Sequence, residues 1–423
     1  MIKTPFIIGL VFLFLFIGGY QHSNNFGTDK IHEVSDDLQP QQANSGSPLI
    51  WRYESEDQIY SVAISSDGEY IVAGQDLTNS KILFFNRTGR TPLWDYTTGN
   101  RVIDVAISAN GTHIAAVSHD MNLYFFNKMS NVPVWVSSGN GGNHVAMSTD
   151  GTYIVASIGT RVYFFERTSA SWLWQYRAPE VISSVDISSD GEFIVAGCQD
   201  DNIYLFNRSG QSLPDATPFR VYSTNCLVLE VSISSDGNYI AATNWDVSEG
   251  TSNVYLYEKS NSSPIWTYNL FNDNYIPKKC LKISSDGNYV LAGTHEKTLL
   301  LFNKTSSIPI WDYTHDGAWW EAVDISYDGS IFVGSNGGII MLFEMPDLLP
   351  KWYYNVEWSI EDLDITPDGK NVVVGSGNHY VYFFSRNQSR SGPSINGFNT
   401  FLVCGLLGLI SVMLVKIRIQ LNK

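Results

Sequence analysis

Two short apolar runs around an Asp-Gly or Asn-Gly pair recur along most of the chain. The first copy, VAISSDGEYIVAG, occupies residues 62–74, and eight copies occur in total. The other copies begin at residues 105, 145, 185, 231, 281, 323 and 363, so the period varies between 40 and 50 residues. A repeat of this length, with runs too short for helices, indicates the blades of a β-propeller rather than a stack of helices.

Each copy continues with a third, aromatic-rich run, of which KILFFN at 81–86 is the first. Most copies then have a fourth run with a Trp: Trp94, Trp135, Trp174, Trp266, Trp311 and Trp352. Four short strands per unit make one propeller blade. We expect each indole to fill the wedge between neighbouring blades, which stabilises the fold by about 2–3 kcal/mol per ring. One fourth run, TPFRVYS at 217–223, lacks a Trp, so one contact between blades is expected to be weaker.

The last copy has no fourth run after YVYFFS, whereas an unpaired Trp-bearing run, LIWRY, stands at residues 49–53. We therefore expect the N-terminal strand to complete the last blade, with Trp51 packed in it, and to remove an open sheet edge. The predicted fold class is all-β: an eight-bladed propeller of four-stranded blades over residues 49–385. In each hairpin, Gly supplies a positive φ and the preceding Asp or Asn tolerates the left-handed region, so these pairs are interpreted as structural.

The N-terminus carries an apolar segment, PFIIGLVFLFLFIGG at residues 5–19, directly after Lys3 and Thr4. This segment is short for a membrane span and suits the apolar region of a secretory signal. Residues 1–20 are therefore interpreted as a cleaved signal peptide, with an uncleaved signal anchor as the alternative. Residues 21–48 are polar and are expected to be a flexible linker.

The C-terminus carries a second apolar segment, residues 398–415, with 18 residues and no charge. Lys416 and Arg418 follow it, so this segment is predicted to be a transmembrane helix with a cytoplasmic tail over 416–423. Residues 386–397 form a short polar linker before it. Together the two ends predict a single-pass type I protein of the cell membrane, with the propeller outside the cell.

Composition limits the classes of partner. A net charge of -16 argues against nucleic acid, because phosphates are bound by Lys and Arg. With 23 Tyr, 22 Phe and 12 Trp, the chain has enough aromatic residues for a sizeable core. The four cysteines do not form a disulfide framework: Cys404 lies in the apolar segment, and Cys198, Cys226 and Cys280 lie in the repeats. The interpretation is buried free thiols, with a Cys198–Cys226 bridge as the alternative.

Two segments, NRTGRTPLWDY at 86–96 and NKTSSIPIWDY at 303–313, resemble the tryptophan-docking repeat of quinoprotein-like propellers. ISSDGEYIVAG with its ILFFN partner is also similar to WD40-type repeats. The resemblance implies a propeller but no single activity, since such propellers host unrelated functions. Quinoprotein dehydrogenases of this group carry a vicinal disulfide, calcium ligands and an Asp base. This sequence has no adjacent cysteine pair, so the resemblance supplies no catalytic, cofactor or metal residue. Non-enzymatic members that scaffold envelope proteins are the closer analogy, although a lipoprotein cysteine near the N-terminus is absent from this sequence.

The first run of each repeat is expected to line a central channel. Two positions per repeat face it: Ser61 and Ala63, Asp104 and Ala106, His144 and Ala146, Ser184 and Asp186, Glu230 and Ser232, Cys280 and Lys282, Ala322 and Asp324, Asp362 and Asp364. A cation site is one interpretation, because hard cations bind where several carboxylates converge. Its candidate ligands are Asp186, Glu230, Asp324, Asp362 and Asp364. The other interpretation is a water-filled channel with solvated or hydrogen-bonded carboxylates, which fits the absence of a spaced ligand loop from the sequence.

Three histidines, His119, His295 and His379, fall in second-to-third strand turns of different blades, so their convergence is not expected. No nucleophile, His and Asp set can be chosen from the many Ser and Asp residues. The prediction is therefore a protein with no catalytic residues, no cofactor and no metal.

Six Asn-x-Ser/Thr sequons are candidate glycosylation sites: Asn86, Asn110, Asn207, Asn261, Asn303 and Asn387. All fall in first-to-second or third-to-fourth strand turns or just after a third strand, so we expect them on one face of the ring. The alternative is that repeats copy turn residues and that Asn suits turns.

The opposite face is expected to bind a partner. Its loops FNDNYIPKK (271–279), THDGAWWEA (314–322) and NVEWSIED (355–362) concentrate aromatic and acidic residues. The candidate partner-binding residues are Tyr275, Trp319, Trp320, Glu321, Trp358 and Glu361. Exposed Trp beside carboxylates suits a protein or a sugar. The alternative is that the Trp rings fold inward and plug the channel.

The predicted function is a membrane-anchored, extracellular, non-catalytic scaffold that binds a protein or glycan ligand. The alternatives are an exported quinoprotein-like oxidoreductase or hydrolase that uses the channel, and an envelope protein that assembles with its own kind.

Overall fold

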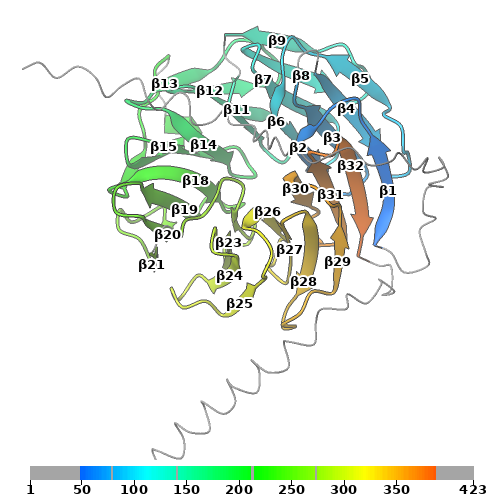
Figure 1. Cartoon of the computed structure of the whole chain (residues 1–423). Coiled ribbons are helices and arrows are strands. Elements are labelled where there is room, and N and C mark those ends of the chain that lie inside the picture. The colour runs from blue at the N-terminus through cyan, green and yellow to red at the C-terminus, as the bar shows by residue number, and fades with distance from the viewer. Residues whose placement is uncertain (1–47, 78–79, 140–141, 211–213, 272–273, 387–423) are drawn as a thin grey trace, which may run out of the picture. The chain divides into compact units, whose positions relative to one another are not determined.

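The computed structural model describes residues 48–77, 80–139, 142–210, 214–271 and 274–386. Within these residues, 32 strands form eight separate four-stranded antiparallel sheets. The sheets are arranged as blades around a central axis (Figure 1). The prediction of an all-β, eight-bladed propeller with four-stranded blades is confirmed.

The first four blades follow the chain without interruption. Blade 1 contains β2 (Ile59–Ile64), β3 (Tyr70–Gln75), β4 (Lys81–Asn86) and β5 (Trp94–Thr97). Blade 2 contains β6 (Val102–Ile107), β7 (His113–Ser118), β8 (Asn122–Asn127) and β9 (Trp135–Ser138). Blade 3 contains β10 (His144–Met147), β11 (Tyr153–Ile158), β12 (Arg161–Glu166) and β13 (Trp174–Arg177). Blade 4 contains β14 (Ile182–Ile187), β15 (Phe193–Cys198), β16 (Asn202–Asn207) and β17 (Arg220–Ser223), with a single 3₁₀ turn, η1 (Arg208–Gly210), after β16.

The other four blades complete the ring. Blade 5 contains β18 (Leu227–Ile233), β19 (Tyr239–Asp246), β20 (Thr251–Glu258) and β21 (Trp266–Leu270). Blade 6 contains β22 (Leu281–Ile283), β23 (Tyr289–Gly293), β24 (Thr298–Asn303) and β25 (Trp311–Thr314). Blade 7 contains β26 (Trp320–Ile325), β27 (Ile331–Asn336), β28 (Ile339–Glu344) and β29 (Trp352–Asn355). Blade 8 contains β30 (Ile360–Ile365), β31 (Asn371–Ser376), β32 (Tyr380–Ser385) and, from the other end of the chain, β1 (Leu49–Glu54).

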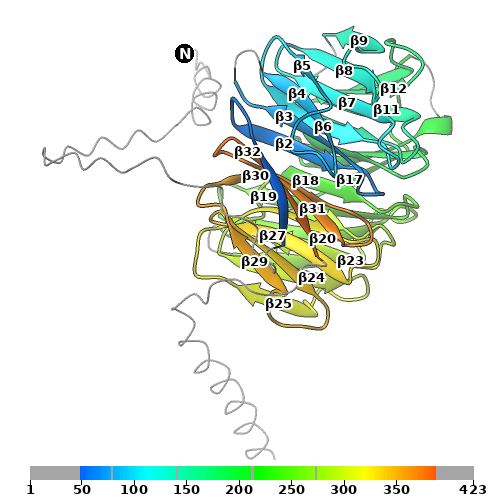
Figure 2. The same cartoon turned by 90° about the vertical axis from the view of Figure 1, so that its right-hand side faces the viewer.

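The N-terminal strand closes the ring, as predicted. β1 pairs antiparallel with β32, with Trp51 opposite Phe383, and the two strands run side by side in Figure 2. The buried Trp51 ring stacks on Phe383 at 5.3 Å between centroids and lies 5.6 Å from Phe85 of blade 1. The strand therefore joins the last blade to the first through a single indole.

Each repeated Trp links its blade to the next. Trp94 stacks on Phe84 of its own blade at 4.9 Å and approaches Phe126 of blade 2 at 5.3 Å. Its Nε1 donates a hydrogen bond to the carbonyl oxygen of Lys128 in blade 2 at 2.9 Å. The same bond to a carbonyl of the next blade is made by Trp51, Trp135, Trp266 and Trp311. For these residues, the prediction that the rings fill the space between blades is confirmed.

Blade 4 departs from this pattern because Arg220 occupies the Trp position. Arg220 pairs with Leu205, as Trp174 pairs with Phe164 in blade 3. The Arg220 Nε atom is buried and has no hydrogen-bond partner among the described residues, and the neighbouring Phe219 ring is exposed. A polar group thus replaces the indole at this contact, and the weaker contact stays a prediction.

The hairpin turns differ from the expected Asp-Gly geometry. Gly68 has a φ of 69° and its N–H donates to the Ser65 carbonyl at 2.8 Å, but Asp67 has no positive φ. Instead, the Asp67 carboxylate accepts a hydrogen bond from the Glu69 N–H at 3.0 Å and one from the Ser65 hydroxyl. The Asp or Asn of the repeat therefore serves to accept hydrogen bonds within the turn, and only Gly uses the left-handed region.

Backbone hydrogen bonds join the hairpin turns of successive blades in one direction. Each N–H donates to a carbonyl of the next turn: Asp67 to Ala109, Ala109 to Thr149, Thr149 to Ser189, Ser189 to Ser235, Ser235 to Ser285, Asp286 to Tyr327, and Tyr327 to Pro367. Pro367 accepts a bond but has no N–H to donate. Among the described residues, no such bond joins the turn of blade 8 to that of blade 1.

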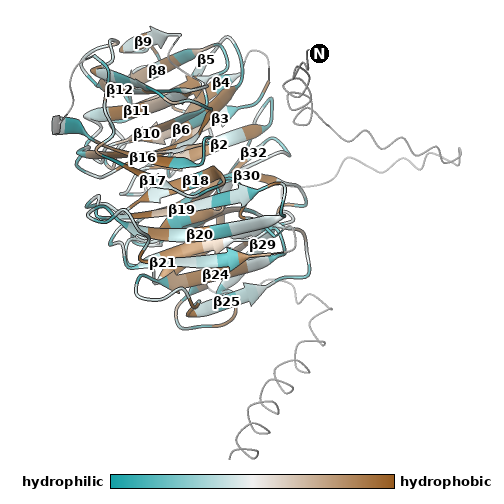
Figure 3. Cartoon of the chain, turned by 90° about the vertical axis from the view of Figure 1, so that its left-hand side faces the viewer, coloured by the Kyte–Doolittle hydropathy of each residue, from teal (hydrophilic) through white to brown (hydrophobic). Residues whose placement is uncertain are grey.

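The core lies between the blades, and apolar colour marks much of the strands while many turns are polar (Figure 3). Cys198, Cys226 and Cys280 are free thiols, and the first and last are buried, so the Cys198–Cys226 bridge is absent from this structure.

The predicted signal, linkers, transmembrane helix and tail lie outside the described residues, except for residues 48 and 386. Among the residues that the structure does describe, no helix is long and apolar enough to cross a membrane.

Candidate functional site

Carboxylates on the first strands connect neighbouring blades around the channel. Asp104 Oδ2 accepts a hydrogen bond from the Val145 N–H of blade 3 at 3.0 Å. The same contact to the next blade is made by four further residues: Asp186 to Ile233, Asp324 to Ile365, Asp362 to Val62 and Asp364 to Ile64. Most of the acidic channel residues found in the sequence are therefore engaged by backbone N–H groups, which agrees with the interpretation of hydrogen-bonded carboxylates.

Lys282 faces the channel among these carboxylates. Although burial opposes it, the charges of Asp324, Asp186 and Asp364 raise the pKa of Lys282 above its usual value. The lysine thus supplies a positive charge at the place where one interpretation of the sequence puts a bound cation. Among the described residues, no group of three or more His, Cys, Asp or Glu side chains is arranged to hold a metal ion.

The channel register is irregular in blade 6, where the structure corrects one expectation. Cys280 is fully buried among core residues and its Sγ donates to the Trp320 carbonyl, so it does not line the channel. The preceding Lys279, with a φ of 63°, projects into the channel instead. Its Nζ lies 3.3 Å from Asp362 Oδ2 and donates to the Tyr60 carbonyl at 3.0 Å.

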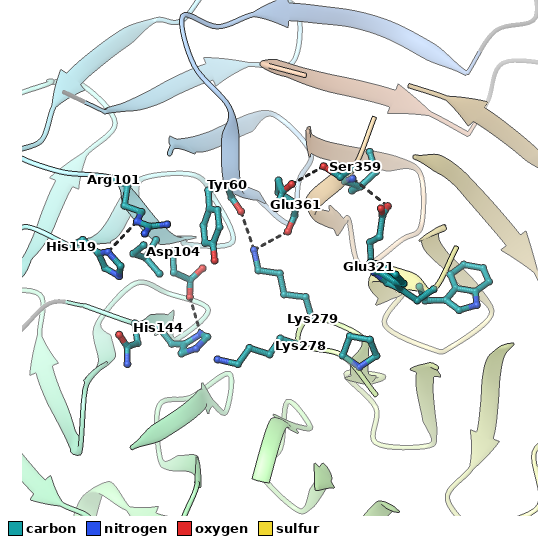
Figure 4. A pocket seen from close by; sticks show the side chains of 16 residues that line it. Tyr60, Arg101, Asp104, His119, His144, Lys278, Lys279, Glu321, Ser359 and Glu361 are labelled. Atoms are coloured by element: carbon teal, nitrogen blue, oxygen red, sulfur yellow. Dashed lines mark hydrogen bonds and ion pairs between the residues drawn. The ribbon is translucent and has the colours of Figure 1, made fainter. Parts of the chain in front are cut away.

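A cavity of about 500 Å³ opens at one end of the channel (Figure 4). It is lined by residues of first strands, of the loops between blades and of second-to-third strand turns, including Tyr60, Arg101, His119, His144, Lys278 and Lys279. We call this end of the ring the pocket face, and the end with the Asp-Gly turns the hairpin face. Lys279 crosses the cavity and ties blade 6 to blades 1 and 8.

Four of the six candidate partner-binding residues line the pocket: Trp319, Trp320, Glu321 and Glu361. Trp319 is 52% exposed, whereas Trp320 is fully buried and packs against Gly293 and Gly334 in the core. Trp320 therefore offers no surface to a partner, and of the two indoles only that of Trp319 is free to make contacts. Trp358 is 58% exposed on the same face. The inward-packing alternative thus describes Trp320 but not Trp319 or Trp358.

Tyr275 takes part in a stack of four rings that the sequence did not suggest. The centroids of Trp245 and Tyr275 are 4.7 Å apart, those of Tyr275 and His295 are 4.9 Å apart, and those of His295 and Trp319 are 5.4 Å apart. The rings come from a strand end, two loops and a turn in blades 5 to 7, so no local spacing reveals them. The stack supports Trp319 from one side and holds it at the pocket rim.

The structure brings two histidines to the pocket. His119 Nδ1 accepts a hydrogen bond from Arg101 Nε at 3.0 Å, and His144 Nδ1 lies 3.8 Å from Asp104 Oδ2. Burial, with the charges of Lys278 and Lys279, lowers the pKa of His144 to about 3. Burial also lowers the pKa of His119, so it favours the neutral form of both rings.

Two carboxyl groups at the pocket have raised pKa values. Burial raises the pKa of Asp104 to about 6 and also raises the pKa of Glu321.

The sequons that the structure describes lie on the hairpin face. Asn110 is in a first-to-second strand turn, Asn86, Asn207 and Asn303 end third strands, and Asn261 follows β20. Third-to-fourth strand turns lie beside first-to-second strand turns, as the Lys128 N–H to Thr112 carbonyl bond of 2.9 Å shows in blade 2. Asn387 lies outside the described residues.

Residues 173–207 match the family model of the WD domain, G-beta repeat. These residues cover one of the eight repeats, from the end of blade 3 through β16. Together with the eight-bladed fold, the match supports a WD40-type β-propeller, a class that typically serves as a non-catalytic scaffold for protein partners. The quinoprotein-like part of the resemblance receives no such support. Comparison with curated proteins gave no match.

Proposed function

We propose that this chain is a membrane-anchored, extracellular β-propeller that binds a protein segment on its pocket face and has no catalytic role. The observation that carries the proposal is the cavity of about 500 Å³ at the channel mouth, with the exposed Trp319 at its rim. Concave sites with aromatic anchors and a few polar groups are the usual places where ligands bind. The stack behind Trp319 holds the ring in place, which lowers the entropy lost on binding.

The membrane anchor is proposed from residues 398–415, which are apolar and are followed by basic residues. β32 ends at Ser385 on the hairpin face, and an extended linker over 386–397 reaches at most about 40 Å. This arrangement supports an orientation in which the hairpin face is directed toward the bilayer and the pocket face is presented to partners. Glycans on the hairpin-face sequons are part of the same proposal.

A glycan is the second candidate ligand. The exposed indoles of Trp319 and Trp358, on the same face as Glu361, favour it because flat aromatic rings beside carboxylates suit a sugar. An oxidoreductase or hydrolase that uses the channel has less support, since most of the channel carboxylates already accept backbone hydrogen bonds.

The test is recovery of crosslinked partners from intact cells that produce the full-length chain. Trp319→Ala with Trp358→Ala is expected to reduce recovery and leave the melting temperature unchanged, because both rings are exposed. Val132→Ala with Ile308→Ala is the matched control, since these exposed apolar residues lie in hairpin-face turns. Unchanged recovery with the first pair, or an equal loss with the control pair, would contradict binding on the pocket face. Treatment of the cells with endoglycosidases before crosslinking distinguishes a glycan ligand from a protein.

A further inference from the structure

The cationic side chains at the pocket mostly have partners. Arg101 Nη1 pairs with Asp76 Oδ1 at 3.3 Å, and Arg101 Nε donates to His119. Lys279 Nζ pairs with Asp362 at 3.3 Å and donates to two backbone carbonyls. Both charges are therefore used to hold blades together.

The acidic side chains at the pocket also have partners. Asp104 accepts hydrogen bonds from one hydroxyl and two backbone N–H groups. Glu321 Oε2 accepts from the N–H groups of Gly338 at 3.3 Å and Ile360 at 3.2 Å, and Glu361 Oε1 accepts from the Ser359 hydroxyl at 2.8 Å. Each of these carboxylates is therefore already engaged by at least one donor of the protein.

Lys278 differs from these residues. Its exposed side chain makes no ion pair or hydrogen bond with any residue that the structure describes. It extends across the pocket toward His144 (Figure 4). Burial is the main cause of the lowered pKa of His144, and the charge of Lys278 is the second cause. The backbone beside it is fixed, because the Lys279 N–H donates to Glu230 Oε2 at 3.2 Å. Among the described residues, no side chain forms an ion pair with this ammonium group, although its charge also acts on the carboxyl group of Glu230.

We propose that the pocket binds a carboxylate of a peptide partner, with the Lys278 ammonium as its counter-ion. The carboxylate belongs either to an Asp or Glu side chain or to the C-terminus of the peptide. This inference rests on the proposed function, since it names the chemistry that the same pocket recognises. The His119 ring adds a neutral donor: its Nδ1 accepts from Arg101, so its proton is on Nε2.

The net charge of -16 does not oppose this assignment at physiological salt. Charges farther away than a Debye length of about 8 Å are largely screened, so the charges that act at contact distance are those of the pocket lining, which has as many basic residues as acidic ones. A hydrogen bond between ammonium and carboxylate is about twice as strong as one between neutral groups.

The test uses the full-length chain in detergent and four pools of random heptapeptides with acetylated N-termini. The central residue is Glu or Gln, and the C-terminus is an amide or a free acid. The Glu-amide pool or the Gln-acid pool is expected to bind at least about tenfold more tightly than the Gln-amide pool, and whichever binds identifies the source of the carboxylate. Lys278→Met is expected to abolish this preference, and Lys278→Arg to keep most of it. Lys370→Met, on the hairpin face, is the matched control.

Equal binding of the four pools, or a preference for acids that survives Lys278→Met, would overturn the carboxylate assignment while peptide binding itself remained. Binding of no pool would overturn this inference as well as the proposed peptide-binding function. If Lys370→Met loses the preference for acidic peptides as fully as Lys278→Met does, the preference comes from the overall charge of the protein, and this result would also overturn the proposal.

Discussion

Asp364 of blade 8 accepts a hydrogen bond from the backbone N–H of Ile64 in blade 1, with 2.8 Å between Oδ2 and N. Two residues earlier, Asp362 accepts from the Val62 N–H at 3.0 Å. Blade 8 is the one blade whose two channel positions are both Asp. These bonds connect the C-terminal strands directly to the first blade and add to the pairing of β1 with β32 in closing the ring.

Asp364→Ala is expected to lower the free energy of unfolding by about 1–3 kcal/mol, because it leaves the Ile64 N–H without an acceptor. Asp364→Asn should cost less, because it keeps an oxygen acceptor, and burial together with Asp324 already raises the pKa of Asp364 well above its usual value. Urea denaturation followed by Trp fluorescence measures both. Asp312→Ala, at an exposed position of β25, is the control. Equal losses for Ala and Asn at 364 would contradict the role of the acceptor.

The contribution of Asp104 to stability is expected to depend on pH. Burial raises its pKa from 3.8 to about 6, so the folded chain holds this proton more tightly than the unfolded chain. Its stabilising contribution is therefore present below pH 3.8 and is lost as the pH rises through 6. Relative to the wild type, Asp104→Asn should become more stable by up to about 3 kcal/mol between about pH 4 and pH 7. Urea denaturation across this range checks the trend, and a constant difference between the two chains would contradict it.

Lys278→Met is expected to raise the pKa of His144. Burial is the main cause of its lowering to about 3, and Lys278 is the next. A lowered His pKa stabilises the fold above 6.5, and that stability is lost as the pH falls toward 3, so the variant should also lose less stability in acid. NMR titration of histidine-labelled chain without peptide measures the shift, and Lys370→Met should leave it unchanged. A His144 titration that is identical in Lys278→Met would show that the two side chains do not interact.

The contact between blades 4 and 5 is predicted to be weaker because Arg220 stands at the Trp position. Arg220→Trp is expected to raise the free energy of unfolding by about 1 kcal/mol, since it removes a buried Nε without a partner among the described residues. Trp94→Arg should lower it by about 3 kcal/mol or more, because stacking and the bond to Lys128 are both lost. Phe219→Trp adds an indole at the exposed neighbouring position and should have little effect. A stability loss in Arg220→Trp, measured by urea denaturation, would show that the site cannot hold the larger ring.

Glycopeptide mass spectrometry of chain secreted or displayed by glycosylating cells is expected to find glycans on Asn86, Asn261 and Asn303. In each, the side-chain oxygen accepts a hydrogen bond from the residue two positions later, which leaves Nδ2 available for modification. Asn100, which is not in a sequon, is the internal control. Unmodified asparagine at all three sites would contradict the proposed modification.

The sequence predicts the blades because the repeat carries its own strand alternation, its turn and its Trp. Closure by Trp51 follows from the number of strands: the last repeat lacks its fourth strand, and an extra strand of this type stands before the first repeat. The pocket was predicted less well. Lys279 enters the channel because its positive φ shifts the start of blade 6, and a strict count back from the hairpin places Cys280 there instead.

The ring stack that ends at Trp319 shows the second limit of the sequence. Trp245, Tyr275 and His295 come from a strand end, a loop between blades and a turn, and only the arrangement of the blades brings them together. Likewise, the pair of adjacent Trp residues at 319 and 320 does not reveal which ring is exposed. That choice depends on the space beside Gly293 and Gly334, which only the packed blades define.

The proline at 367 gives the circle of turns a beginning and an end. Among the described residues, peptide groups pass hydrogen bonds in one sense from Asp67 to Pro367, and the series ends at Pro367, whose imide nitrogen carries no hydrogen. A ring of identical repeats has no preferred place to open, whereas this one is marked at a single junction. A circular permutant that keeps the same order of blades would carry this mark in its interior, with the two aspartates of blade 8 still beside it. The repeats are therefore not interchangeable, because the junction between blades 8 and 1 differs from the other junctions wherever the termini of the chain are placed.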